Sequence, residues 1–565
     1  MGLPPRAPLN ENSAPAPASL RPLLAWLFVA VLTTSLLLFS GTVRSADGGT
    51  MLAVTRSLAT RGSWEVPPGS VGRPGRDGRL YAQYGPACSV AALPLFLAGH
   101  GLARAAQLSP ERTAQVEEFA VALFNPLVVA LITVLVCLAA AELGVVPRWA
   151  AAGGLLCAFG TGLFVQMKDF NSEPLTALLF LGAFYVLLRQ RKSVTTGGMA
   201  WAGALAGAAI LARPSNALGA VILGVAILVL AVRQGDGLRA AGRVACFALP
   251  VLAGVGLYGW YNYARFGNPF DTGYHEVTFD YPLLRGLWLQ LFSLERGLVW
   301  YNPLVLLVPI GALLLWRRGE KAAVALAAAM AAGFVLLYSA YAQAPAGGHS
   351  MGQRFLLVVV PLLIVMAVPA VERAGRGGRG ATGETPVVPG RARAGSASSA
   401  PPLLQGEGVG GEAPRVRGPW TRVLVVAIIA VSVLVQLPLV WVNPSYYYAG
   451  VNAEREQAAP GTAPGADQAA LVRSWALAAE VTSDALTRPE WVRSLPERAG
   501  PIATAAELLP GPRSFHVPYF WWALAWAYGV PGMAIWAAML GNLALALICA
   551  RGLSRSWPAV KETAS

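Results

Sequence analysis

Residues 20–47 read L-R-P-L-L-A-W-L-F-V-A-V-L-T-T-S-L-L-L-F-S-G-T-V-R-S-A-D and join an apolar run to an acidic residue. The run from Leu20 to Ser40 is nearly free of charge, and about 20 such residues suffice to cross a bilayer as a helix. Asp47 follows at the water boundary, and Asp169 stands in V-Q-M-K-D-F-N-S-E-P-L between two further apolar runs. Two carboxylates at one end of a helical bundle can do acid–base chemistry on a molecule arriving from lipid. The pattern indicates a polytopic membrane enzyme.

Composition supports a membrane protein, because 55% of the 565 residues are hydrophobic and only 13% are charged. The apolar residues gather in blocks of membrane-spanning length, without an amphipathic period. The net charge of +14 is spread over short loops and one long linker, so no nucleic acid partner is expected. Five cysteines show no metal-ligand spacing and indicate neither a zinc site nor a disulfide framework: Cys88, Cys137, Cys157, Cys246 and Cys549.

The predicted fold is an all-α polytopic membrane protein with about twelve transmembrane helices. The first is interpreted as retained, since no clean cleavage site follows it. The predicted spans are 21–41, 119–143, 148–166, 173–190, 198–212, 215–233, 244–263, 298–316, 321–343, 354–371, 421–442 and 519–550.

Loop charges predict the orientation of these spans. With a cytoplasmic N-terminus, every cytoplasmic connection carries a basic residue, as the positive-inside rule requires. Residues 85–103 are apolar but contain two prolines, a histidine and several small residues, and counting them as a span would invert everything downstream. We therefore predict an interfacial helix there. Four long loops then face outward: 42–118, 264–297, 343–353 and 443–518.

Four regions follow from this reading. Residues 1–20 form a cytoplasmic tail, and 21–371 form a transmembrane catalytic module that includes the outer loop 42–118. Residues 372–420 are rich in Gly, Pro, Ser and Arg without a hydrophobic period, which predicts a disordered cytoplasmic linker. Residues 421–565 form a C-terminal membrane region with the outer loop 443–518.

Several sequence motifs, distributed along the first two thirds of the chain, carry a resemblance to a known family. The first outer loop carries A-V-T-R-S-L-A-T-R-G-S-W-E-V (53–66) and L-Y-A-Q-Y-G-P (80–86). R-F-G-N-P-F-D-T-G-Y (265–274), L-F-S-L-E-R-G-L-V-W-Y-N-P (291–303) and G-G-H-S-M-G-Q-R-F-L (347–356) follow it. From about residue 20 to 371 the sequence resembles GT-C glycosyltransferases, which include protein O-mannosyltransferases and lipid A aminoarabinose transferases. Many of these carry Asp-Glu where this chain has Asp47-Gly48.

The resemblance implies transfer of a sugar from a polyprenyl-phosphate donor. The phosphate is a good leaving group, so one carboxylate that takes the acceptor's proton suffices, and Asp47 is the expected base. Asp169 is the expected partner that steers the acceptor or sugar. Glu173 is a further candidate for substrate binding, and it also has a structural explanation, because acids are favoured in the first turn of a helix.

Cations near the same boundary are the expected phosphate ligands. Arginine binds phosphate through two donors at once, and Arg354 follows the flexible G-G-H-S-M-G-Q. The remaining candidates for substrate binding are His349, Arg265, Arg213 and Lys168, with Tyr81, Gln83 and Tyr84 along the sugar. Lys168 is equally interpretable as a snorkelling anchor and the tyrosines as aromatic belt residues.

The expected function is an inverting glycosyltransferase of the bacterial inner membrane. Both termini are expected in the cytoplasm, and the active site on the extracytoplasmic face. Besides the lipid-linked donor and membrane lipids, its partner is a lipid, glycan or protein acceptor. No cofactor is firmly indicated, although D-T-G-Y-H-E (271–276) has residue types that suit a divalent cation. The alternatives are a secondary transporter, which predicts ionisable residues near mid-membrane, and a flippase or polymerase of lipid-linked glycans.

Deleting about 40 residues between Arg376 and Gly418 should leave membrane insertion and activity intact, since a disordered segment contributes no packing. Expression level and thermal stability in detergent would measure this. A deletion variant that fails to fold would show that the segment is structured.

Overall fold

The computed structural model describes residues 17–43, 45–191, 194–233, 237–274, 277–294, 296–341, 352–376, 419–441, 478–479 and 532–556. Most of the predicted linker 372–420 and of the outer loop 443–518 lies outside these residues, as do His349 and residues 275–276. The predicted N-terminal tail 1–20 ends earlier than expected, because the first helix begins at Pro17.

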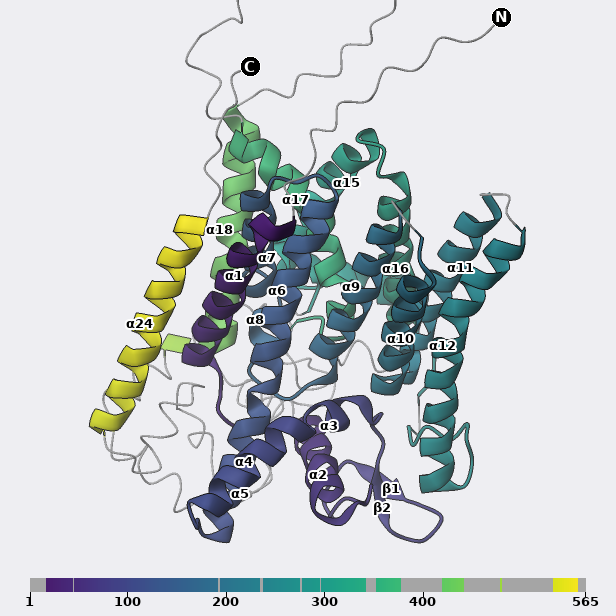
Figure 1. The fold of residues 1–565 in the computed structure, drawn as a ribbon, viewed down its shortest axis with the longest axis vertical. Coiled ribbons are helices and arrows are strands. Elements are labelled where there is room, and N and C mark those ends of the chain that lie inside the picture. Colours follow the sequence, from purple (N-terminus) through teal and green to yellow (C-terminus); the bar gives the residue numbers. More distant parts are fainter. Residues whose placement is uncertain are drawn as a thin grey trace, which may run out of the picture.

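Helices make up nearly all of the described chain, which confirms the all-α polytopic fold (Figure 1). In chain order the α-helices are α1 (Pro17–Leu38), α2 (Ala46–Arg61), α3 (Ala87–Ala91), α4 (Leu93–Ala105), α5 (Pro110–Ala122), α6 (Phe124–Glu142), α7 (Pro147–Phe159), α8 (Leu163–Gln166), α9 (Ser172–Gln190), α10 (Thr196–Ala212), α11 (Ala217–Arg233), α12 (Gly237–Phe266), α13 (Leu283–Phe292), α14 (Leu298–Tyr301), α15 (Val308–Arg317), α16 (Lys321–Ala340), α17 (Val360–Arg376), α18 (Pro419–Trp441) and α24 (Gly532–Ser556). Three 3-10 helices, η1 (Pro214–Asn216), η2 (Pro303–Leu307) and η3 (Phe355–Val358), stand between them. One hairpin pairs β1 (Gly72–Pro74) antiparallel with β2 (Leu80–Ala82).

Eight helical stretches of the described chain are long and apolar enough to cross a membrane, so the count of twelve is not confirmed. The other four predicted spans are helical but short or interrupted: 148–166, 198–212, 298–316 and 354–371. Prolines and glycines cause the interruptions. The G-T-G sequence at 160–162 separates α7 from α8, and Asn302-Pro303 replaces an α-helical turn by η2.

The first outer loop folds at one end of the bundle, where α2, α3, α4, α5 and the hairpin lie together (Figure 1). We call this the α2–α5 end. Residues 85–103, predicted as an interfacial helix, form α3 and most of α4, and α4 packs against α5. The described ends of the chain, the start of α1 and the end of α24, lie at the opposite end (Figure 1). They lie together because α1 and α24 pack side by side, with Asn542 Nδ2 donating to Thr33 O at 3.1 Å.

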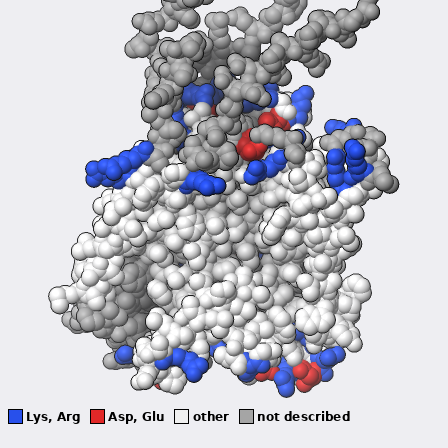
Figure 2. All heavy atoms as spheres, viewed as in Figure 1, with Lys and Arg blue, Asp and Glu red and all other residues white. Residues whose placement is uncertain are grey.

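An apolar belt surrounds the bundle between the two ends. On the face shown in Figure 2, Lys, Arg, Asp and Glu lie at the two ends, and the surface between them carries none. The buried charged residues of the described chain lie in loops or near helix ends, except Glu117, which lies mid-helix in α5 at the α2–α5 end: Glu117, Lys168, Glu173, Arg265, Arg296, Arg354 and Glu372. This pattern fits a multi-pass membrane protein whose span centres are uncharged.

Close packing of α10 on α12 fixes the helix end that precedes Arg213. A Cβ atom at Gly207 would lie 2.7 Å from the carbonyl oxygen of Pro250, and one at Gly203 would lie 2.2 Å from that of Phe247. Only glycine permits this approach of two backbones. The contact therefore fixes how far α10, and Arg213 at its end, extends along α12.

Orientation in the membrane remains a prediction. A reporter active only in the cytoplasm should be active when fused after Gln190 or within 374–418, and silent when fused within 443–518, because of the loop charges. Reversed signals would place the α2–α5 end in the cytoplasm.

Candidate active site

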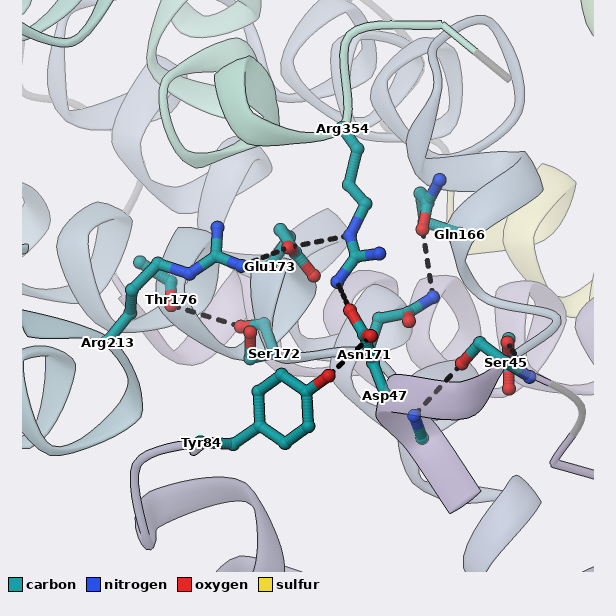
Figure 3. A network of polar contacts seen from close by, with 12 residues as sticks. Ser45, Asp47, Tyr84, Gln166, Asn171, Ser172, Glu173, Thr176, Arg213 and Arg354 are labelled. Atoms are coloured by element: carbon teal, nitrogen blue, oxygen red, sulfur yellow. Dashed lines mark hydrogen bonds and ion pairs between the residues drawn. The ribbon is translucent and has the colours of Figure 1, made fainter. Parts of the chain in front are cut away.

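Five predicted site residues from distant parts of the sequence meet at the α2–α5 end (Figure 3). Asp47 lies in the first turn of α2 and Glu173 in the first turn of α9. Arg213 follows α10, Arg354 precedes η3, and Tyr84 comes shortly after β2. Each is thus placed by the end of a helix or strand, where the chain leaves the apolar belt.

One oxygen of Glu173 bridges the two arginines. Its Oε1 lies 2.8 Å from Nε of Arg354 and 3.2 Å from Nη2 of Arg213. Glu173 and Arg354 are buried, with exposed fractions of 4% and 9%, and Arg213 is 15% exposed. Burial removes water that would screen these charges, so each arginine depends on the carboxylate for compensation.

Both oxygens of Asp47 are engaged. Oδ2 accepts a hydrogen bond from Nη2 of Arg354 at 2.5 Å, and Oδ1 accepts one from the Tyr84 hydroxyl, also at 2.5 Å. The Asp47 side chain is nevertheless 28% exposed, so it is reachable from outside the protein. Among the four charged groups of this cluster, two carboxylates balance two guanidinium groups.

The surroundings keep Asp47 ionised and Tyr84 neutral. Burial by itself would raise the pKa of Asp47. Three opposing effects are together larger and lower this pKa below 3.8: the charge of Arg354, the hydrogen bonds from Tyr84 and Arg354, and the charge of Arg213. Burial, followed by the Asp47 charge, raises the pKa of Tyr84 far above its ordinary value. Tyr274, whose ring meets that of Tyr84 edge-on, has its pKa raised to about 12, first by burial. Both phenols therefore act as neutral groups.

Position 48, next to Asp47, has room for glycine alone. A Cβ atom at position 48 would lie 2.7 Å from the carbonyl oxygen of Phe170 and 2.8 Å from Oγ of Ser45. A glutamate there would push the 169–171 segment away from α2. The close contact of these two segments leaves Asp47 as the acid at this position.

Asp169 contacts backbone groups near the cluster. Its Oδ2 accepts from the N–H of Ser45 at 3.0 Å, and its Oδ1 accepts from the N–H of Phe170 at 2.8 Å. Ser45 is the N-cap of α2 and accepts from the N–H of Gly48 at 3.0 Å. Asp169 thus holds the start of the helix that carries Asp47, while its predicted contact with acceptor or sugar stays a prediction. The acid that joins the arginines is Glu173.

Three other predicted binding residues, Lys168, Arg265 and Tyr81, have contacts within the protein, and their binding roles stay predictions. Lys168 does not snorkel to the surface, because it is 2% exposed and its Nζ donates to the carbonyl oxygen of Val440 at 2.5 Å. Arg265 is fully buried, with its guanidinium 3.6 Å from the Tyr261 ring centroid and donating to the carbonyl oxygen of Ala82. Tyr81 donates from its hydroxyl to Oδ2 of Asp77 at 2.8 Å.

Gln83 precedes Tyr84 in sequence, and a hydrogen bond from its side chain acts on the Tyr84 hydroxyl. His349 falls outside the described residues, so its predicted role stays untested. The described residues include no group of three or more His, Cys, Asp and Glu side chains placed to hold a metal ion. Because His275 and Glu276 are not described, the cation expected at D-T-G-Y-H-E stays untested as well.

Three amides that the sequence analysis missed shape the segment between α8 and α9. Asn125 lies in the first turn of α6 and is fully buried. Its Nδ2 donates to the carbonyl oxygens of Gln166, Asp169 and Asn171. Asn171 Nδ2 donates to Oε1 of Gln166 at 2.9 Å. These bonds fix the irregular backbone that presents Glu173. Asn125, a lone asparagine at the start of an apolar span, could have indicated this contact, because a buried amide needs hydrogen-bond partners.

Solved structures with a similar arrangement exist. ArnT from Cupriavidus metallidurans in the apo state is 14% identical over 95% of this chain and 73% of its own, with a TM-score of 0.45. Its complex with undecaprenyl phosphate is 15% identical over 86% of this chain and 81% of its own, with a TM-score of 0.44. Archaeal oligosaccharyltransferase AglB from Archaeoglobus fulgidus, in complex with an inhibitory peptide and a dolichol-phosphate, is 12% identical over 80% of this chain, with a TM-score of 0.46. The match covers 59% of AglB. No family model and no curated protein matches the sequence. Identities this low say nothing about which residues act.

Replacing Glu173 by alanine should destabilise the protein by about 3–5 kcal/mol, because two buried guanidinium groups lose the carboxylate between them. Unfolding in detergent would measure the loss. Glu65→Ala is the matched control, since Glu65 pairs with Arg61 and Arg79, whose side chains are 54% and 62% exposed, and should change stability little. Equal stability of the two variants would contradict the bridging role.

Proposed function

We propose that this protein is an inverting membrane glycosyltransferase of the GT-C type that uses a polyprenyl-phosphate sugar as its donor. The observation that supports this most is the cluster of Asp47, Glu173, Arg213 and Arg354 at the α2–α5 end of an apolar bundle. It combines a reachable carboxylate with two arginines at one end of the apolar belt, where a lipid phosphate would lie. Of these residues, Arg354 lies in one of the motifs that resemble GT-C enzymes, and Asp47 stands where many of those enzymes carry Asp-Glu.

The reaction follows from these groups. Arg213 and Arg354 would bind the donor phosphate, since guanidinium groups pair with phosphate oxygens in two-donor geometry. Asp47 would take the proton of the acceptor hydroxyl as its oxygen bonds to the anomeric carbon. The bond between that carbon and the phosphate oxygen breaks, and its electron pair leaves with the lipid phosphate. Attack from the side opposite the phosphate inverts the anomeric centre.

The charge distribution favours an enzyme over the alternatives. A secondary transporter is expected to carry ionisable residues near mid-membrane, whereas the described chain holds its buried charges in loops, near helix ends and, for Glu117, in α5 at the α2–α5 end. A flippase or polymerase of lipid-linked glycans needs basic residues but no specific base. The engagement of Asp47 by both Arg354 and Tyr84 is therefore the feature that favours a transferase.

Asp47→Asn keeps shape and polarity but cannot take the acceptor's proton, so turnover should fall by about two to four orders of magnitude. The assay incubates purified protein with radiolabelled polyprenyl-phosphate sugars and cell-envelope acceptors. Normal transfer by a well-folded Asp47→Asn protein would refute the assignment of the base.

Arg354 tests the phosphate site in the same assay. Arg354→Ala should raise the apparent donor KM far more than Arg354→Lys, since lysine keeps the charge but loses the two-donor geometry. A donor KM unchanged in Arg354→Ala would remove the residue from the phosphate site. If no polyprenyl-phosphate sugar supports transfer by the wild-type protein, the proposed function itself fails.

A further inference from the structure

The groups that would bind the donor phosphate are already paired with carboxylates. Arg354 gives Nε to Glu173 and Nη2 to Asp47, and Arg213 gives Nη2 to the same Glu173 oxygen. Two arginines and two carboxylates sum to zero charge. A phosphate that approaches this cluster therefore meets no excess positive charge, and it gains strong hydrogen bonds only by replacing a carboxylate.

The base is blocked by the same contacts. Asp47 Oδ2 is held by Arg354 and Oδ1 by Tyr84, so neither oxygen is simply available to an acceptor hydroxyl. Ionic and hydrogen-bonded partners favour the charged form of a carboxylate and so weaken it as a base. The arrangement that keeps Asp47 ionised also opposes its protonation.

Resting on the proposed function, we propose that donor phosphate and Asp47 compete for Nη2 of Arg354, so that phosphate binding releases Asp47 to act as the base. The donor then binds before the acceptor. Asp47 is the carboxylate that gives way, because its side chain is 28% exposed while that of Glu173 is 4% exposed.

Glu173 is the positioning residue in this exchange. Its contact with Arg354 uses Nε, which is a different nitrogen from the one that binds Asp47. Nη2 is therefore free to change partner while Nε stays anchored. Since the same Oε1 also holds Arg213, both guanidinium groups remain side by side for the phosphate.

The charges balance through the transfer. A donor phosphodiester adds one negative charge to the neutral cluster. When the acceptor oxygen attacks, its proton moves to Asp47, which becomes neutral, and the leaving phosphate gains the electron pair and one further negative charge. The total stays the same, so the negative charge moves from Asp47 to the group that both arginines face.

Asp47 is the group expected to titrate in this part of the site. The groups whose charges or hydrogen bonds act on it are Tyr84, Arg354 and Arg213, and Asp47 in turn acts on Tyr274 and Tyr341. Burial raises the pKa of all three tyrosines, so they stay neutral in acid, and arginines stay charged. Glu173 acts on the same site through Arg354 and Tyr274.

The test measures binding and requires no turnover. The probe is a short-chain polyprenyl methyl phosphate, a phosphodiester whose single charge stays constant across the pH range used. Asp47→Asn should bind it about tenfold more tightly than the wild type near neutral pH, because Arg354 no longer has a competing carboxylate. Asp77→Asn is the matched control. It removes an aspartate of the same outer loop that contacts Tyr81 and Arg79, and should leave the affinity unchanged.

The wild-type protein provides a second measurement that needs no variant. Probe binding removes the counter-ion of Asp47 and so raises its pKa. The affinity should therefore rise as the pH falls through the pKa of Asp47 in the complex, where Asp47 takes up a proton, and level off only below the lower pKa of Asp47 in the free protein. In Asp47→Asn this pH dependence should disappear.

The outcomes separate this inference from the proposed function. Weaker or unchanged binding by Asp47→Asn, or a wild-type affinity that does not depend on pH, overturns the competition. Failure of the probe to bind either protein overturns it as well. Sugar transfer by the wild type is assayed separately, so a transferase without this exchange would show normal transfer and pH-independent binding.

Discussion

The candidate site depends on one buried carboxylate oxygen. Oε1 of Glu173 contacts guanidinium groups that are 141 residues apart in sequence, Arg213 and Arg354. In an environment with little water, two neighbouring arginines repel each other unless an anion lies between them. The bridge thus holds the loop after α10 against the segment before η3, and Arg354 extends the connection to Asp47. The ion pairs determine the site's shape as well as its charge.

Irregular segments of the helical bundle determine the position of the Glu173 carboxylate. A regular helix through residues 160–171 would satisfy its backbone internally, but the chain breaks at 160–162 and runs without helix from 168 to 171. Asn125 and Asn302 supply hydrogen bonds that the broken segments lack, at the carbonyls of 166, 169 and 171 and at the N–H of Gly162. The resulting turn brings Asp169 to the start of α2 and Glu173 to the arginines.

The direction of each predicted helix explains which parts of the candidate site could be predicted from the sequence. The apolar runs fix which loops share an end of the bundle, and this alone brought Asp47, Tyr84, Glu173, Arg213 and Arg354 to one end. Hydropathy did not distinguish Asp169 from Glu173, because the choice depends on backbone N–H groups of Ser45 and Phe170 that only the folded loop presents. The contacts of Arg265 were not predictable for a similar reason, since its partner Ala82 O lies 183 residues away in sequence. The breaks in the short spans left no mark on hydropathy.

Pairing the arginines with carboxylates solves one physical problem and creates another. Buried guanidinium groups without partners would cost several kcal/mol each, so neutralisation lets them stand next to lipid. Neutralisation also lowers their attraction for a phosphate, which must then displace a partner of comparable strength. The cluster resolves this conflict by asymmetry, because one carboxylate is deeply buried and the other is partly exposed. In the proposed reaction, the buried carboxylate keeps the arginines in place, and the exposed one is both the easier to displace and the one that an acceptor would reach.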